Sequence, residues 1–251
     1  MISIKNNLLV KIFYPIFYIL FAASITLSVC FIVQKNAYIN IYVSGTSMKP
    51  TLMGDINGDR RVHYGIADTS VQVKQKLKRF DVVVTYFPES WGTGSTMKVK
   101  RVWGFPGETI ELKTDTTEKK VKFTVYKDET VVSSYQSEVL VNKEFTFEKY
   151  DIENGNYTYN TNLDVFPFNT GEKTFDINYS ERNCKLSLKE NEYFLMGDNW
   201  ASSTDSYEKR FDPNRITFSN IQGKVVRIEG TARLDNQVLI DKKVCAPKYN
   251  F

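Results

Sequence analysis

The sequence predicts a mostly β protein that is preceded by one apolar helix able to cross a membrane. An uncharged apolar run lies near the N-terminus. After it, short β-branched and aromatic runs recur between turn residues, and no long stretch has the 3.6-residue apolar period of a helix. The 251 residues are enough for one domain or two small ones.

Composition and charge exclude several classes of protein. Hydrophobic residues make up 42% of the chain and charged residues 25%, which is typical of a globular protein and not of a disordered one. The net charge is only +4, with Lys and Arg scattered among nearly equal numbers of Asp and Glu, so we expect no nucleic-acid partner. The three Cys form no CxxC pair and there is a single His, so the sequence predicts no zinc site.

The apolar run predicts a transmembrane anchor over residues 12–34, which contain no charged residue. Residues 12–33 would span roughly 33 Å as a helix, against about 30 Å of hydrocarbon. Pro15 is expected in the first turn, where its missing N–H is tolerated. A cleaved signal peptide would have an apolar region of about 7–15 residues, so an uncleaved anchor is the preferred interpretation.

The charges that flank the anchor favour one orientation. Lys5, Lys11 and the amino terminus precede it, whereas Lys35 and Lys49 follow it. Under the positive-inside rule we expect residues 1–11 to be cytoplasmic. The rest of the chain would then lie on the extracytoplasmic side of the cell membrane.

The part after the anchor contains a series of expected strands. Pro106-Gly107 predicts a tight turn and Asn154-Gly155 a hairpin. Cys184 and Cys245 would both lie where a disulfide can form, although their spacing does not indicate that they pair. The expected strands cover residues 81–87, 97–103, 108–112, 120–126, 145–152, 157–163, 193–196 and 225–234.

A loop shortly after the anchor could present a nucleophile. Residues 44–51 read SGTSMKPT, and a serine hydroxyl in such a loop needs a base in order to attack a carbonyl. The only histidine, His63, lies in a segment that reads as a surface turn. The other base that works with serine is a buried lysine. Taken alone, a small-residue loop of this kind is more often an ordinary loop.

Four segments together resemble the sequence boxes of the type I signal peptidases, or leader peptidases. They occur in that family's order behind an anchor, and the single anchor resembles the Gram-positive branch. They are the serine box at 47–51 (SMKPT), the aspartate–valine strand at 79–84 (RFDVVV), the lysine box at 100–108 (KRVWGFPGE), and the Gly-Asp-Asn box at 197–206, which contains GDN followed by STDS.

This resemblance implies a Ser–Lys endopeptidase that removes signal peptides from secretory precursors after small residues of the Ala-x-Ala type. Ser47 would be the nucleophile. Lys100 would be the general base and would later return its proton to the leaving amine. Ser203 would orient the lysine, and Asp205 and Gly197 would support it. The resemblance implies no metal or organic cofactor.

The resemblance also implies the substrate subsites and the domain organisation. Val43, Met48 and Val99 would help line shallow pockets for the small residues at −1 and −3 of the substrate. The fold would be a large antiparallel, barrel-like β-sheet domain, with a smaller inserted subdomain. We expect residues 35–113 and 190–251 to form the catalytic domain, with 114–189 as the non-catalytic insertion and the lipid bilayer as a partner.

The chain departs from the family pattern at two positions. Many members have Arg directly after the final Asp-Ser, where this chain has Tyr207; Arg210 could replace it. Some members have Ser two positions before the nucleophile as an oxyanion donor, where this chain has Gly45. The hydroxyl of Ser44 or of Thr46 could then be the second donor.

A lysine base requires a lowered pKa. From a reference pKa of about 10.4, a shift of about 3 units is needed near neutral pH, and burial can supply it. We expect the strand at 97–103 and Phe105 to provide the apolar surroundings, with Asp205 held away from the amine. Lys98 and Lys100 lie on the same strand face, so alternation does not choose between them; the position before Arg101 selects Lys100 by resemblance.

Three other functions compete with this hypothesis. One is a signal-peptidase-like chaperone or specialised processing protein for pilus or surface-protein assembly; a non-hydrolytic homologue would lack Ser or Lys, and both are present. Another is a binding module on an anchor, which the four ordered boxes argue against. The third, a self-cleaving repressor, shares Ser–Lys chemistry but would need a DNA-binding helix-turn-helix.

Overall fold

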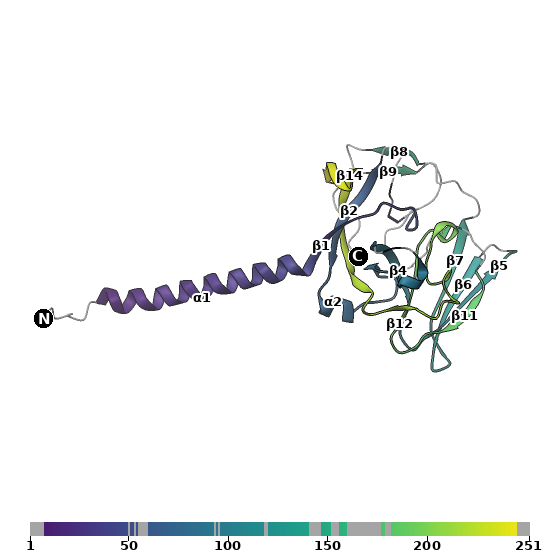
Figure 1. Cartoon of the computed structure of the whole chain (residues 1–251), viewed down its shortest axis with the longest axis horizontal. Coiled ribbons are helices and arrows are strands. Elements are labelled where there is room, and N and C mark those ends of the chain that lie inside the picture. Colours follow the sequence, from purple (N-terminus) through teal and green to yellow (C-terminus); the bar gives the residue numbers. More distant parts are fainter. Residues whose placement is uncertain are drawn as a thin grey trace. The chain divides into compact units, whose positions relative to one another are not determined.

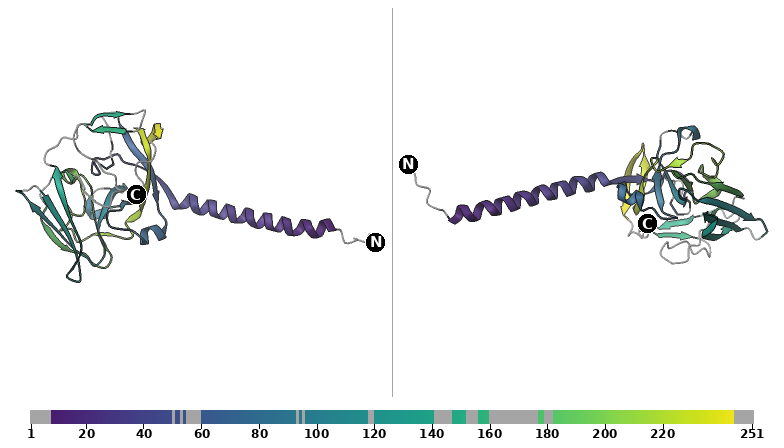
Figure 2. Two further views of the ribbon diagram at one scale, coloured as in Figure 1. Left: turned by 180° about the vertical axis from the view of Figure 1, so that it is seen from behind. Right: turned by 90° about the horizontal axis from the view of Figure 1, so that it is seen from below.

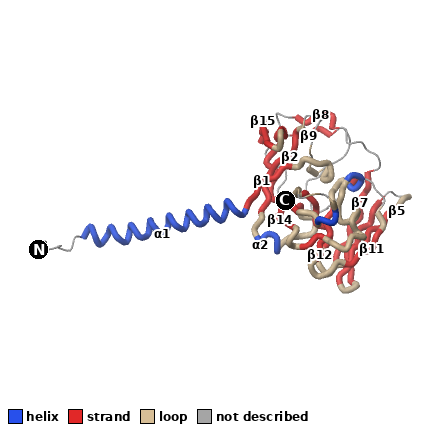
Figure 3. Tube along the Cα trace, viewed as in Figure 1, coloured by secondary structure: helices blue, strands red, loops and turns tan. Residues whose placement is uncertain are grey.

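A computed structural model of the protein describes residues 8–49, 51–52, 54, 60–92, 94, 96–117, 120–140, 147–151, 156–159, 177–178 and 182–244. The chain divides into two units, Met1–Tyr38 and Ile39–Phe251. The second unit consists mostly of strands joined by loops (Figure 3). The mostly β fold with one N-terminal apolar helix is therefore confirmed.

The first unit contains the helix α1, Leu8–Ala37, whose segment Phe13–Ile32 is long and apolar enough to cross a membrane. The hydroxyls of Thr26 and Ser28 donate to carbonyls four residues earlier, at 2.9 Å each, so these two polar groups are satisfied within the helix. Pro15 lies inside the helix. The prediction that it occupies the first turn was wrong, because the helix begins at Leu8.

The larger sheet contains eight of the described strands, in the order β1-β2-β14-β3-β4-β12-β13, with β15 paired to β14. The pairings with a described register are antiparallel. The strands are β1 (Tyr38–Tyr42), β2 (Arg61–Asp68), β3 (Val82–Thr85), β4 (Lys98–Gly104), β12 (Glu192–Met196), β13 (Ile216–Thr217), β14 (Ile221–Asp235) and β15 (Val238–Val244).

A second sheet of five strands has the order β10-β7-β6-β5-β11, and β8 and β9 form a separate antiparallel pair. The hairpin dipeptide at 154–155 and Cys245 lie outside the described residues. These strands are β5 (Thr109–Asp115), β6 (Lys120–Lys127), β7 (Thr130–Leu140), β8 (Phe147–Asp151), β9 (Asn156–Tyr159), β10 (Ile177–Asn178) and β11 (Cys184–Ser187).

Short helical turns and one glycine shape the connections. They are α2 (Val71–Gln75) and two 3-10 turns, η1 (Glu89–Trp91) and η2 (Trp200–Ser202). The predicted turn before β5 is present: Glu108 donates its backbone N–H to the Phe105 carbonyl at 3.2 Å. Gly107 has φ +75°, a conformation that favours glycine.

A shared core joins the two sheets. Trp103 from β4 and Phe194 from β12 pack in one cluster with Ile110 from β5 and Phe123 from β6. Figures 1 and 2 show the five-stranded sheet on the far side of β4 from β2 and β14. The five-stranded sheet therefore packs against the strand that contains Lys100.

The segment around His63 was predicted to be a surface turn, and this prediction was wrong. It forms β2, which pairs with β14, and the His63 side chain is only 4% exposed. The charged residues Asp59 to Arg61 gave the segment a polar appearance, but Arg61 is itself buried and bound to Asp241. Pairing with the long β14 makes it a core strand.

Candidate active site

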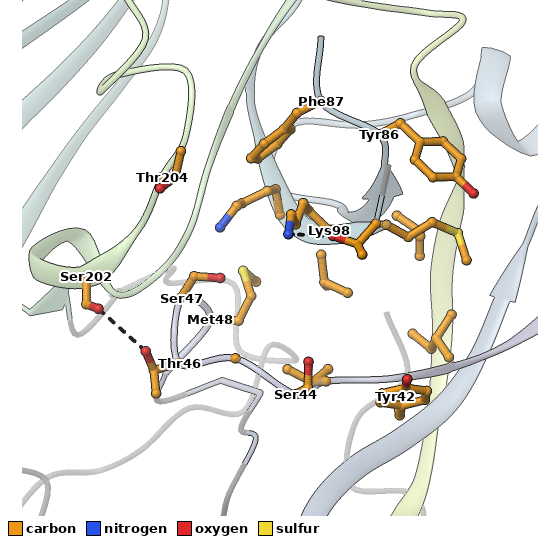
Figure 4. A pocket seen from close by; sticks show the side chains of 18 of the residues that line it. Tyr42, Ser44, Thr46, Ser47, Met48, Tyr86, Phe87, Lys98, Ser202 and Thr204 are labelled. Carbon is orange, nitrogen blue, oxygen red and sulfur yellow. Dashed lines mark hydrogen bonds between the residues drawn. The ribbon is translucent and has the colours of Figure 1, made fainter. Parts of the chain in front are cut away.

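A pocket of about 650 Å³ lies between the loop after β1 and the start of β4 (Figure 4). Ser47 and Lys100 both line it, and the Ser47 hydroxyl points into it. Its walls come from residues 40–48, 84, 86–87, 96–100, 202 and 204. All four sequence boxes, which are distant along the chain, thus contribute at least one residue to this cavity.

The loop that contains Ser47 is held by core packing of Met48 and by hydrogen bonds from Asn199. Met48 is buried in a core cluster with Leu52 and Val43. Asn199 donates its backbone N–H to the Ser47 carbonyl at 2.9 Å and its side-chain amide to the Thr46 carbonyl at 3.1 Å. These contacts leave the Ser47 side chain half-buried at the pocket, where a substrate can reach it.

Lys100 has the surroundings of an uncharged amine. It is 2% exposed, its Nζ donates to the Ser203 hydroxyl at 3.1 Å, and the Phe87 ring centroid lies 5.9 Å away. Burial lowers the pKa of Lys100 from 10.5 to about 8, although the charges of Asp205 and Asp198 act to raise it. Near pH 8 about half of the molecules would hold this amine neutral.

Lys98, two residues earlier, has different surroundings. It is half-buried, and its Nζ donates to Thr96 Oγ1 at 2.7 Å. Figure 4 shows it at the same pocket, in accordance with the shared strand face. The apolar group beside Lys100 is Phe87, which the sequence did not single out, whereas Phe105 packs on Tyr193 and Arg79.

Gly197 lies where no side chain would fit. A Cβ at this position would be 2.3 Å from the Ser47 carbonyl oxygen and 2.4 Å from Ser203 Oγ. Its N–H donates to Asp205 Oδ2 at 3.3 Å, and the other oxygen of Asp205 accepts from the N–H of Tyr207 at 3.0 Å. Asp205 therefore binds backbone, and no hydrogen bond between it and Lys100 is recorded among the described residues.

A buried ion pair connects the four boxes. Arg101 donates to Asp198 through Nε at 2.8 Å and Nη2 at 2.5 Å. It also donates to the Phe80 carbonyl at 2.7 Å, and Thr51 donates to Asp198 at 2.5 Å. The serine box, the aspartate–valine strand, the lysine box and the Gly-Asp-Asn box thus meet at one charged pair.

An arginine from a different part of the chain lies beside Asp205. Arg182, before β11, places Nη1 3.7 Å from Asp205 Oδ1. Arg210, the candidate from sequence, donates to the Tyr207 carbonyl at 2.9 Å and lies over the Tyr207 ring. Sequence reasoning missed Arg182 because 23 positions separate it from Asp205 and it belongs to no box.

The residues expected to contact substrate line the pocket. Val43 and Met48 are buried beneath it, and Val99 is half-buried in its wall. Tyr86 and Phe87 also line it and were not singled out from the sequence. They lay at the end of the strand predicted over residues 81–87, and in the structure they directly follow β3.

The possible oxyanion donors lie in the serine loop. A Cβ at Gly45 would meet nothing within 4 Å, so the position is open. The Thr46 hydroxyl is 3.5 Å from the Ser202 hydroxyl, and the exposed Ser44 lines the same pocket. The hydroxyls of Ser44 and Thr46 are both still candidates for the second oxyanion donor.

The chain is similar to known proteins of one family. The family model described as signal peptidase, peptidase S26, matches residues 15–228. A protein named signal peptidase I from Streptococcus pneumoniae serotype 4 is 29% identical over 171 residues, covering 66% of this chain and 72% of that protein. Signal peptidase I P from Bacillus subtilis subsp. natto is 28% identical over 185 residues, covering 74% and 75%.

The family match includes all four boxes and most of α1. Because it extends over more than half of the sequence, the chain belongs to the signal peptidase family, peptidase S26.

Proposed function

We propose that this protein is a membrane-anchored endopeptidase that removes N-terminal signal peptides from secretory precursors, with Ser47 as nucleophile and Lys100 as general base. The observation that carries the proposal is the buried Lys100 amine, which shares a pocket with Ser47 and donates to Ser203. The family match supports the activity.

The proposed chemistry begins with neutral Lys100. It takes the proton from Ser47 Oγ as that oxygen attacks the carbonyl carbon of the scissile bond. The resulting ammonium gives its proton to the leaving amine, and an acyl-enzyme forms on Ser47. Lys100 then takes a proton from a water molecule as the water oxygen attacks the acyl carbon. The Lys100 ammonium gives this proton to Ser47 Oγ as the acyl bond breaks, which releases the acid product and restores the neutral amine and the serine hydroxyl. Ser203 orients the amine without adding charge.

The substrate would bind as an extended peptide along exposed strand edges. β12 pairs with β4 only from Arg101 to Gly104, so among the described strands Lys98–Lys100 has a strand partner on the β3 side alone. Val43, Met48 and Val99 would line shallow subsites at −1 and −3. Large side chains would overlap these walls, which favours Ala-x-Ala-like sites.

The anchor would hold the site near the bilayer surface, where cleavage sites emerge. We propose that residues 1–11 are cytoplasmic and that residues 35–113 and 190–251 form the extracytoplasmic catalytic domain, with 114–189 inserted. The bilayer is then a partner through α1, and no nucleic acid is involved.

The test is cleavage of a secretory precursor by the purified full chain in detergent. We expect Ser47→Ala and Lys100→Met to abolish cleavage while the circular dichroism spectrum and thermal midpoint stay close to wild type. Lys98→Met is the matched control and should retain most activity. Full activity of Ser47→Ala, or an inactive Lys98→Met beside an active Lys100→Met, would overturn the assignment.

The pH dependence gives a second readout. The base must be neutral, so kcat/KM should rise with pH through about 8, the lowered pKa of Lys100. A rate that keeps climbing above pH 10 would contradict a buried lysine base.

A further inference from the structure

Arg182 is a fully buried arginine outside the pocket, two residues before β11 of the five-stranded sheet. Its side chain is 0% exposed, and its guanidinium carbon lies 4.2 Å from the ring centroid of Tyr207 and 5.2 Å from that of Trp200. Thr114 fixes the backbone of Arg182. The Thr114 hydroxyl accepts a hydrogen bond from the Arg182 N–H at 2.7 Å and donates one to the Arg182 carbonyl at 3.0 Å. Packing and backbone contacts together hold the guanidinium in place.

The buried charge of Arg182 is matched by Asp205. Nη1 lies 3.7 Å from Asp205 Oδ1, and both side chains are fully buried. Nη2 donates to the Trp200 carbonyl, whereas Nη1 and Nε have no hydrogen-bond acceptor among the described residues. A guanidinium stays protonated in proteins, so burying it requires a counter-charge. Glu208, 4.0 Å from Nη1, is 52% exposed, which leaves Asp205 as the buried counter-charge.

Asp205 in turn connects Arg182 to the proposed site. Its carboxylate accepts the N–H groups of Gly197 at 3.3 Å, Tyr207 at 3.0 Å and Glu208 at 3.3 Å. These bonds hold the loop that contains Ser203. The same negative charge acts to raise the pKa of Lys100.

The other charges around Lys100 are Asp198 and Lys98, and their effects are opposite. Asp198 acts to raise the pKa of Lys100 and Lys98 acts to lower it. Asp198 is already balanced by two hydrogen bonds from Arg101. Asp205 is therefore the carboxylate whose effect on Lys100 depends on Arg182.

We propose that Arg182 is a positioning residue of the active site: it balances the charge of Asp205, so that this carboxylate can hold the Ser203 loop without drawing a proton onto Lys100. The inference rests on the proposed Ser–Lys function. It assigns a role at the site to the segment before β11, which lies in the predicted non-catalytic insertion.

The test is the pH profile of kcat/KM for Arg182→Met, measured on the full chain in detergent with a peptide that contains an Ala-x-Ala site. Loss of the guanidinium leaves Asp205 less balanced, so Lys100 should keep its proton to higher pH. We expect the acidic limb to move up by about one pH unit, and kcat/KM at pH 7 to fall about tenfold.

Arg210→Met is the matched control. Arg210 also lies over the Tyr207 ring, 4.3 Å from its centroid, but binds the Tyr207 carbonyl instead of Asp205. The acidic limb of the kcat/KM profile of Arg210→Met should coincide with that of the wild type. Arg182→Lys keeps the charge without the planar group, so its limb should stay near wild type even if its thermal midpoint falls. A folded Arg182→Met with an unchanged limb would overturn the proposal.

A second comparison applies if Arg182→Met does not fold. Asp205→Asn retains Arg182 without its counter-charge, and the double variant Asp205→Asn/Arg182→Met lacks both charges. The limb of Asp205→Asn should lie at lower pH than that of the double variant, because a remaining cation disfavours protonation of Lys100. Coincident limbs would overturn the proposal.

The failure of this inference can be told apart from the failure of the proposed function. Titration of the Lys100 side chain by NMR in the Ser47→Ala background reports its protonation without cleavage. If Lys100 titrates near pH 8 there and Arg182→Met leaves that value unchanged, the role of Arg182 is wrong and the Ser–Lys function stands. If Ser47→Ala still cleaves precursor, the proposed function fails, and this inference fails with it.

Discussion

Two buried arginine–carboxylate pairs lie near the pocket, and their geometries differ. Arg101 binds Asp198 through bonds of 2.8 and 2.5 Å, whereas Arg182 lies 3.7 Å from Asp205 between aromatic rings. The first carboxylate is satisfied mainly by its arginine, and the second mainly by backbone N–H groups. Tight charge pairing serves to join segments, while looser pairing leaves a residual field that can act on Lys100.

The largest expected effect comes from breaking the tighter pair. Asp198→Asn leaves Arg101 buried without a counter-charge and should lower the free energy of unfolding by about 3–5 kcal/mol. Urea denaturation of the full chain in detergent measures the change. Asp205→Asn should cost less, because its arginine is also held by two rings. Equal losses in the two variants would remove the distinction between the pairs.

Gly197→Ala tests the residue that lies between the two carboxylates and the serine loop. The added Cβ would lie 2.3 Å from the Ser47 carbonyl oxygen, so that backbone must move. A displacement of about 1 Å can cost about 100-fold in rate, and we expect a loss of at least that size in precursor cleavage.

The control for Gly197 is Gly104→Ala. There the nearest atoms are the side-chain ends of Ile110 and Leu188, in the core away from the pocket. This variant should lose stability and retain cleavage. Near-normal activity of Gly197→Ala would show that the close approach to Ser47 is not needed.

The buried His63 makes the stability of the protein depend on pH, so the two arginine–carboxylate pairs should be compared at a pH where His63 is neutral in both the folded and the unfolded chain. Burial lowers its pKa from 6.5 to about 4, so the unfolded chain binds this proton more readily than the folded one. The contribution of neutral His63 to the free energy of unfolding is therefore complete above pH 6.5. It is lost as the pH falls towards 4, which lowers the free energy of unfolding by about 3 kcal/mol. Thermal unfolding from pH 7 to 4 measures the slope, which His63→Gln should flatten while cleavage persists.

The smallest effect is expected from Lys98→Met. Lys98 acts to lower the pKa of Lys100, but it is half-buried and solvent screens its charge. Its loss should move the acidic limb of kcat/KM upward by less than one pH unit. A shift larger than that of Arg182→Met would make Lys98, and not the Arg182–Asp205 pair, the main control on the base.

Much of the fold could be predicted from local patterns. The run of valines after Asp81, the alternation around Phe123 and the Pro106-Gly107 turn all correspond to observed elements. β2 was missed because the charged residues before His63 resemble a turn, while β14, the strand that pairs with β2, begins about 160 residues after Arg61. Short-range patterns contain no information on such a partner.

The candidate site was predictable only by resemblance. The four boxes identified Ser47, Lys100 and Ser203, and the structure shows that the last two are in contact. Phe87 and Arg182 escaped notice, since neither belongs to a box and each reaches the site through the packing of another element.

The sequence by itself determined the apolar helix, the predominance of strands and the order of the four boxes, because these depend on residue type and short-range spacing. Only the tertiary structure decided which lysine is buried. Alternation places Lys98 and Lys100 on one face of β4. Among the described residues, the Phe87 ring and the Ser203 hydroxyl contact Lys100 and not Lys98. The tertiary structure likewise brought Arg182 to Asp205. Burial and charge balance depend on contacts between distant segments, and the physical environment of the proposed base is therefore a property of the folded chain.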